Sequence, residues 1–130
     1  MLKWDSKYEL GHERIDFEHH IFLGLVTEFQ EVASQLAPKE KQLRVLNEIV
    51  KYAEFHFLSE ENIMEDCHYP DKARHVVLHQ ALLAEAKDNL HSFVRNNITA
   101  DDVFQFLFEW FALHTSTEDK KLVAYIASAK

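Results

Sequence analysis

The stretch His56–His79, HFLSEENIMEDCHYPDKARHVVLH, carries two pairs of potential metal ligands separated by a polar turn. The first pair is His56 and Glu60, and the second pair is His75 and His79. Residues four apart on an α-helix differ by only about 40° around its axis, so each pair points off one face of its helix. The stretch therefore predicts two successive helices whose ligand pairs can converge on a metal.

The apolar residues that precede this stretch repeat every three or four positions, as in a helix that buries one face. The repeat begins at Ile15, and His19 occupies one of its inward positions. We expect this first helix to end at about Ala37, because Pro38 disfavours a helical conformation in the residue before it. Residues 1–12 are expected to form an N-terminal arm.

The residues that follow the stretch predict a fourth helix whose last inward position is His114. Its start is marked by Thr99 and Asp102, which have the form of an N-cap with an acidic residue in the first turn. The next inward carboxylate is Asp119, and a step of five residues rotates a side chain by about 140° on an ideal α-helix. His114 and Asp119 can share a site only across a break or a π-bulge. We therefore expect a break near Thr115, followed by a short fifth helical segment.

The composition agrees with long helices joined by short turns. The chain has only two glycines and two prolines among 130 residues, and 47% of its residues are apolar, which favours long elements over many short strands. Four amphipathic helices of this kind predict an all-α fold, an antiparallel up-down-up-down four-helix bundle. No repeat or linker divides the sequence, so we expect one domain over residues 1–130.

Charge and hydropathy exclude several classes of partner. Fourteen basic and twenty-two acidic residues give a net charge of −8, which repels nucleic acid and anionic lipid. The first ten residues contain no apolar h-region and the sequence has no run of about 18 apolar residues, so we expect neither export nor a membrane span. The single cysteine, Cys67, rules out an internal disulfide and fits a reducing compartment. A cytoplasmic protein that binds neither nucleic acid nor membrane is expected.

The inward positions of the predicted helices hold an unusual set of polar side chains. Taken singly, each motif has an ordinary explanation: a hydrogen-bonded core histidine, a surface salt bridge, or adventitious zinc binding. Together the set contains five imidazoles and two carboxylates: His19, His56, Glu60, His75, His79, His114 and Asp119. Burying them without a counter-charge is costly, since even one unpaired buried ion costs several kcal/mol. A metal centre removes this cost.

The number and type of donors narrow the choice of metal. Seven ligands exceed what one ion can hold, and two carboxylates suit a bridge between two ions about 3.5–4 Å apart. Imidazoles mixed with carboxylates match iron better than thiolate sites or the all-oxygen sites of calcium and magnesium do. The sequence therefore predicts a pair of iron ions.

The spacing of these residues resembles that of the hemerythrins, and among them the single-domain bacterial hemerythrins. The similarity rests on His19, His56-Phe57-x-x-Glu60-Glu61, Tyr69-Pro70-x-x-x-x-His75-x-x-x-His79 and His114-x-x-x-x-Asp119-Lys120. It extends nearly from end to end and includes the arm. The resemblance implies a non-haem di-iron site, further bridged by an oxo or hydroxo group, that binds O₂ reversibly.

The resemblance also implies a role for each residue. It assigns one iron to His75, His79 and His114, the other iron to His19 and His56, and the bridges to Glu60 and Asp119. The iron with two histidines keeps one position open. The walls of the O₂ pocket are expected to be mainly apolar and, by position, to be Phe22, Phe57, Trp110, Phe111 and Thr115. Thr115 stands where the family often has Ile, and Phe111 where Leu is usual.

The resulting hypothesis is an O₂-binding protein, not an enzyme, for carriage, storage or delivery to an oxygen-consuming enzyme. Three alternatives remain open: an enzyme that reduces peroxide or nitric oxide at the same centre, a sensor of O₂ or redox state, and an iron-handling protein. A site inside the bundle does not require a second subunit, so a monomer is expected.

Overall fold

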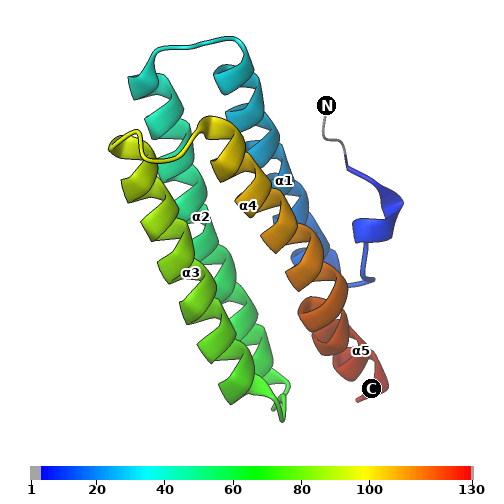
Figure 1. Cartoon of the computed structure of the whole chain (residues 1–130). Coiled ribbons are helices and arrows are strands. Elements are labelled where there is room, and N and C mark those ends of the chain that lie inside the picture. Colours follow the sequence, from blue (N-terminus) through cyan, green and yellow to red (C-terminus); the bar gives the residue numbers. More distant parts are fainter. Residues whose placement is uncertain (1–3, 130) are drawn as a thin grey trace.

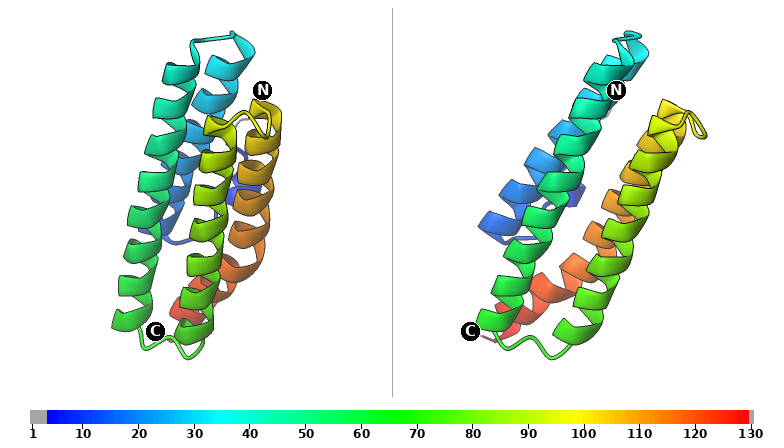
Figure 2. Two further views of the ribbon diagram at one scale, coloured as in Figure 1. Left: turned by 60° about the vertical axis from the view of Figure 1, so that its left-hand side comes forward. Right: turned by 90° about the vertical axis from the view of Figure 1, so that its left-hand side faces the viewer.

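The computed structural model describes residues 4–129, which are helical almost throughout and contain no strand. The helices are α1 Glu13–Ser34, α2 Lys39–Asp66, α3 Lys72–Val94, α4 Ala100–His114 and α5 Lys120–Ser128, with a short 3-10 turn at Ser6–Tyr8 (Figure 1). The first four run antiparallel, each packs on the next along the chain, and α1 closes against α4 (Figure 2). This arrangement confirms the predicted up-down-up-down bundle. No helix within residues 4–129 is long and apolar enough to cross a membrane.

Two helix ends illustrate how local sequence sets the boundaries. α4 begins with the predicted cap, because Thr99 and Asp102 each accept a hydrogen bond from the other's backbone N–H. α1 ends at Ser34, three residues before the expected Ala37. Leu36 adopts a left-handed backbone conformation with φ of 54°, which ends the helix before Pro38 can influence it.

The end of α4 differs from the expected break. The chain stays helical through a π turn, Thr115–Asp119, and α5 begins only at Lys120. The π-bulge, which the sequence analysis considered beside a break but did not choose, is therefore the geometry present. The hydroxyls of Ser116 and Thr117 donate to one backbone carbonyl in the last turn of α4, at 3.3 and 2.6 Å. They bond to the preceding helix and do not cap a restarted one.

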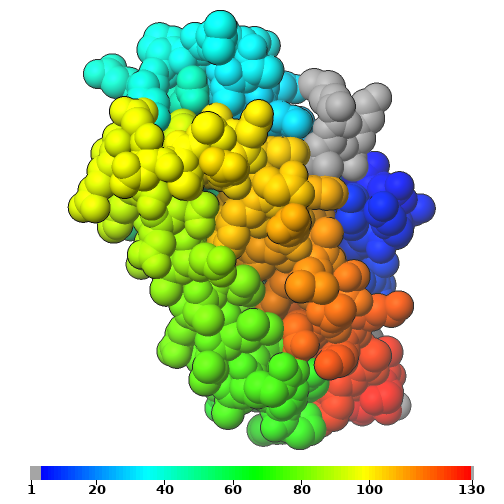
Figure 3. Space-filling view, in the orientation of Figure 1, coloured from blue at the N-terminus to red at the C-terminus, as the bar shows by residue number. Residues whose placement is uncertain are grey.

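Residues 4–12 of the predicted N-terminal arm lie outside the bundle, against α1 and α4 (Figures 1 and 3). The Tyr8 ring packs edge-on against Phe111 of α4, with ring centroids 5.2 Å apart. Trp4 stacks on His20 of α1 with centroids 4.7 Å apart. The arm therefore covers the side of α4 that carries Phe111, and residues 1–3 of the predicted arm lie outside the described range.

The buried apolar side chains form two clusters along the bundle. The larger cluster fills most of the space between α1, α2 and α4 and includes Phe22. The smaller one surrounds Ile15, Met64 and Leu122 near the α2–α3 turn. On α1 the buried His19 falls between Ile15 of one cluster and Phe22 of the other. A polar layer thus separates the two apolar cores.

Candidate metal centre

Seven buried polar side chains from four helices and the π turn meet in this layer. They are His19 from α1, His56 and Glu60 from α2, His75 and His79 from α3, His114 from α4 and Asp119 from the π turn. None of them is more than 7% exposed. All are the residues that the sequence places on inward positions. Spacings of three or four residues keep six of them on the buried stripe of their helix, and the π turn brings in Asp119.

The possible ligand atoms fall into two overlapping groups. One group consists of Glu60, His75, His79, His114 and Asp119, and the other of His19, His56, Glu60 and Asp119. Within each group the ligand atoms lie within 4.8 Å of one another. Both carboxylates belong to both groups, so the arrangement suits two cations that share Glu60 and Asp119.

The two oxygens of Glu60 face different groups. Oε2 lies 3.0 Å from His56 Nε2 and 3.5 Å from His19 Nε2. Oε1 lies 3.1 Å from His79 Nε2 and 3.5 Å from His75 Nε2. A carboxylate placed in this way can give one oxygen to each of two ions.

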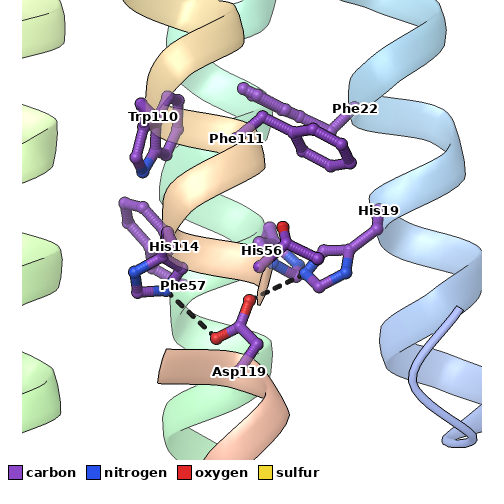
Figure 4. Close-up of a pocket in the computed structure, with 9 residues that line it drawn as sticks. His19, Phe22, His56, Phe57, Trp110, Phe111, His114 and Asp119 are labelled. Carbon is purple, nitrogen blue, oxygen red and sulfur yellow. Dashed lines mark ion pairs between the residues drawn. The ribbon is translucent and has the colours of Figure 1, made fainter. Parts of the chain in front are cut away.

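Asp119 divides its oxygens in the same manner. Oδ2 lies 2.9 Å from His19 Nε2, whereas Oδ1 lies 3.0 Å from His114 Nε2 and 3.4 Å from His75 Nε2. Figure 4 shows the Asp119 carboxylate between His19 on one side and His114 on the other. The π turn makes this possible, because its additional residue turns Asp119 toward the face that carries His114.

Many of these atoms approach one another without forming hydrogen bonds. Within residues 4–129, both ring nitrogens of His19 and His75 and both oxygens of Glu60 and Asp119 are buried and have no hydrogen-bond partner. Leaving a buried polar group unpaired costs about 1–3 kcal/mol, and more for a charged one. Nε2 of each ring and the four carboxylate oxygens lie close to one another instead, and cations among them would satisfy these atoms.

The carboxylates of the cluster favour positive charge at its centre. Burial lowers the pKa of His56, but the Glu60 and Glu18 carboxylates outweigh it and raise this pKa to about 10. Burial likewise lowers the pKa of His114, and Asp119 and Glu60 outweigh it to give about 10. Burial and the charge of Glu60 raise the pKa of Asp119, but His114 and His19 outweigh them and hold it below its ordinary value. Protons on the imidazoles thus supply charge that bound cations would replace.

Glu18, to which the sequence analysis gave no role, supports one of the histidines. Its Oε1 lies 2.7 Å from His56 Nδ1, and its Oε2 accepts hydrogen bonds from Ser59 Oγ at 2.8 Å and Arg14 Nε at 3.0 Å. Holding Nδ1 as the donor leaves Nε2 of His56 free to bind a metal. A signal was available, because Glu18 comes three residues after Ile15 on the inward stripe of α1.

Glu61 performs the corresponding task in the larger group. Its Oε2 lies 2.9 Å from His79 Nδ1. Glu61 belongs to the motif that carries the family resemblance, but periodicity gave it no role, because it is about 100° from Glu60 around the helix. Each ligand group therefore contains one histidine whose outer nitrogen is held by a carboxylate.

A small cavity of about 20 Å³ borders the cluster, enough for one water-sized molecule. Its lining consists of His19, Phe22, His56, Phe57, Trp110, Phe111, His114, Thr115 and Asp119. All five residues predicted to form the O₂ pocket are among them, and Figure 4 shows the aromatic rings above the histidines. Both histidines of the smaller group contribute to the lining, whereas His75 and His79 do not. The cavity is therefore on the side of the smaller ligand group.

Known proteins resemble this chain both in sequence and in fold. Residues 10–126 match the family described as Hemerythrin HHE cation binding domain. A bacteriohemerythrin from Stenotrophomonas maltophilia is 24% identical over 120 residues, which cover 92% of this chain and 78% of the relative. A bacteriohemerythrin from Clostridium acetobutylicum is 24% identical over 132 residues, covering 95% and 99% of the two chains. A myohemerythrin from Theromyzon tessulatum is 26% identical over 119 residues, covering 92% and 88%.

Solved structures share the bundle. The crystal structure of a hemerythrin variant with one leucine replaced by alanine superposes with a TM-score of 0.86 at 21% identity, over 96% of each chain. A second hemerythrin variant, with a leucine replaced by tyrosine, gives a TM-score of 0.83 at 22% identity over 92% of each chain. At these identities the likeness shows that the fold is shared.

Proposed function

Because the chain belongs to the hemerythrin HHE cation-binding family, we propose that its buried cluster holds two iron ions and binds O₂ reversibly. The family match and the clustered ligands establish a hemerythrin-like cation-binding domain. Iron is proposed because five imidazoles and two carboxylates suit it better than they suit zinc, which takes four ligands, or calcium, which takes oxygen. The names of the relatives, bacteriohemerythrin and myohemerythrin, support the same proposal.

The observation that carries the proposal is the division of carboxylate oxygens. Glu60 and Asp119 each direct one oxygen toward the histidine pair and the other toward the histidine triplet. A single ion cannot use this arrangement, since the four oxygens point to two separate groups. Two ions held by shared carboxylates account for all seven side chains.

The unequal groups support O₂ binding at one end of the centre. The larger group offers three imidazoles and the smaller one only two, His19 and His56. An ion in the smaller group has fewer protein ligands, and the cavity of about 20 Å³ lies beside it. Phe22, Phe57 and Phe111 line this cavity, and such walls exclude water and hinder the escape of charged oxygen species.

Bound iron would supply the electrons that are transferred to O₂ when it binds and returned when it is released. The chain holds the ligands in place before any metal binds: Glu18 fixes the ring of His56, and Glu61 fixes the ring of His79. Carriage, storage or delivery of O₂ to an oxygen-consuming enzyme in the cytoplasm, by a monomer, remains our prediction for the physiological role.

The test is to reduce the iron-loaded protein without air and to cycle it between O₂ and vacuum. We expect two irons per chain and a visible charge-transfer band that appears and disappears reversibly. Irreversible oxidation in the first cycle, or turnover with peroxide or nitric oxide, would favour an enzyme instead. A protein that retains one zinc and no iron would contradict both readings.

Two histidine variants make the test specific to the cluster. His19→Gln removes one of the two imidazoles of the smaller group, so we expect this variant to lose iron from that group and to lose the O₂-dependent band. His91→Gln is the matched control, because His91 is exposed and distant from the cluster in sequence. It should retain two irons and the reversible band.

A further inference from the structure

Two hydrogen-bond donors line the cavity without a protein partner. The first is the indole N–H of Trp110, whose side chain is only 8% exposed and whose Nε1 is buried with no hydrogen-bond acceptor among residues 4–129. Figure 4 shows this nitrogen at the end of the ring that faces the histidines. The neighbouring rings of Phe22 and Phe57, with centroids 4.7 and 5.5 Å away, offer no oxygen or nitrogen. A buried tryptophan usually finds a partner, so this N–H is unusual.

The second donor is the hydroxyl of Thr115, which is 2% exposed. A threonine in a helix commonly donates to the carbonyl three or four residues earlier. Ser116 and Thr117 do so, since both donate to the carbonyl of Leu113. No such bond is made by the Thr115 hydroxyl within the described part of the chain, although its residue lines the cavity. Its hydroxyl is therefore available to a molecule in the cavity.

Both donors are close in sequence to His114, one of the histidines of the cluster. Trp110 comes four residues before His114 on α4, and Thr115 comes immediately after it. Holding His114 in the cluster therefore also holds these two side chains at the wall of the cavity. The indole N–H can only donate, whereas a hydroxyl donates or accepts. The wall also contains His19, His56, His114 and Asp119, which belong to the ligand cluster. Apart from them, its polar groups are these two donors, which favour acceptors.

We propose that Thr115 and Trp110 donate hydrogen bonds to the outer end of a small ligand in this cavity and thereby select ligands whose outer atom carries negative charge. The inference rests on the proposed function, because the cavity borders the smaller ligand group. Hydrogen bonds to a charged acceptor are about twice as strong as those between neutral groups. The cavity should therefore discriminate by charge in addition to size.

Azide is a suitable probe, since it is small and its terminal nitrogens carry negative charge. Its dissociation constant for the oxidised, iron-loaded protein is measured by visible titration. We expect Thr115→Val to raise this constant about tenfold or more, and Trp110→Phe to raise it by a similar factor, because each removes one bond to a charged acceptor. Thr117→Val is the matched control in the same π turn, and its constant should stay within about twofold of wild type.

A second measurement needs no metal. The Thr115 hydroxyl makes no hydrogen bond within residues 4–129, so in metal-free protein Thr115→Val should leave the melting temperature unchanged or raise it. Thr117→Val should lower the melting temperature, because it removes the 2.6 Å bond to Leu113. A fall for Thr115→Val larger than that for Thr117→Val would show that the hydroxyl has an internal partner and would overturn the inference.

The outcomes separate this inference from the proposed function. Protein that loads two irons but binds no azide, or whose Thr115→Val and Trp110→Phe variants bind azide as wild type does, overturns the inference alone. Protein that does not load iron overturns the proposed function and the inference together. Tenfold weaker azide binding with unchanged iron content supports the assignment of the two donors.

Discussion

Replacing Glu18 by Gln should weaken the binding of one metal ion and leave the other nearly unchanged. Glu18 is 4% exposed and lies 2.7 Å from Nδ1 of His56, which belongs to the smaller group of possible ligands only. Burial raises the pKa of Glu18, but hydrogen bonds from His56, Ser59 and Arg14 outweigh it and hold the carboxyl ionised at neutral pH. Glutamine keeps the shape of the side chain but removes its charge.

The expected size of the effect follows from these bonds. The amide keeps one oxygen, but its NH₂ group cannot accept the bonds that Ser59 and Arg14 now donate at 2.8 and 3.0 Å. A hydrogen bond to a charged group contributes about 1.5–3 kcal/mol. Loss of a carboxylate behind a metal-bound histidine typically costs 10–100-fold in metal affinity, which corresponds to about 1.4–2.7 kcal/mol. The hydrogen-bond energy and the typical loss of metal affinity therefore predict similar free-energy changes.

Glu61→Gln provides the matched comparison at the other ligand group. Glu61 makes one 2.9 Å contact with His79, and its side chain is 26% exposed, so solvent weakens the interaction. We expect a loss of metal affinity below about tenfold, confined to the ion of the larger group. Glu54→Gln, which weakens only surface ion pairs with Lys87 and Lys51, should change neither ion.

The assay loads each variant with zinc, which avoids redox chemistry, and follows release to excess chelator by stopped-flow. Glu18→Gln should accelerate one release phase about 10–100-fold, and Glu61→Gln should accelerate the other phase by less. Thermal unfolding of each variant checks that the fold is intact. Wild-type release from Glu18→Gln, or equal acceleration of both phases, would refute the division of the ligands into two groups.

Three further predictions concern the bridge, the pH dependence and a helix cap. Asp119→Asn should reduce bound metal from about two ions per chain to one or fewer, as measured by elemental analysis. Asp88→Asn, on the surface of α3, is the control and should bind as much metal as wild type does. Equal metal content in the two variants would exclude a bridging role for Asp119. In the metal-free protein His56 and His114 have pKa values of about 10, above the ordinary value of 6.5, so the folded chain binds more protons than the unfolded chain. The contribution of these two histidines to the stability of the fold is complete below pH 6.5 and is lost toward pH 10. The free energy of urea unfolding, measured with a chelator present, should therefore fall over this interval. A profile that does not change with pH would contradict the prediction. Thr99→Ala removes the capping box of α4 and should cost about 1 kcal/mol in urea unfolding without changing metal content, so loss of metal would contradict a purely local role.

The sequence predicted the features that depend on spacing within one helix. His75 and His79 share a helix face wherever that helix lies, so periodicity was sufficient to place them inward. The same reasoning gave the bundle and identified the step of five between His114 and Asp119 as incompatible with a regular α-helix. It predicted a break, and a π turn is present instead. Spacing alone cannot distinguish the two geometries, because either one brings the two side chains to one face.

Features that depend on contacts between helices were not predictable in the same way. Glu18 has an inward position that spacing reveals, but its pairing with His56 spans 38 residues and depends on how α1 and α2 pack. The early end of α1 depends on Leu36 adopting a left-handed conformation, which is rare for a leucine and has no signature in the sequence. Trp110 and Thr115 were placed in the pocket by position, but the lack of an acceptor for the buried indole N–H depends on how Phe22 and Phe57 pack around it.

The polar layer between the two apolar cores has a consequence for the cooperativity of folding. The small cluster of Ile15, Met64 and Leu122 is joined to the rest of the core through side chains whose mutual attraction depends on protonation when no metal is bound. Metal ions in this layer would make the two halves of the bundle unfold as one unit. Without them, the half that contains α5 becomes the smaller and weaker cooperative unit, and its backbone amides would be the first to lose protection from hydrogen exchange.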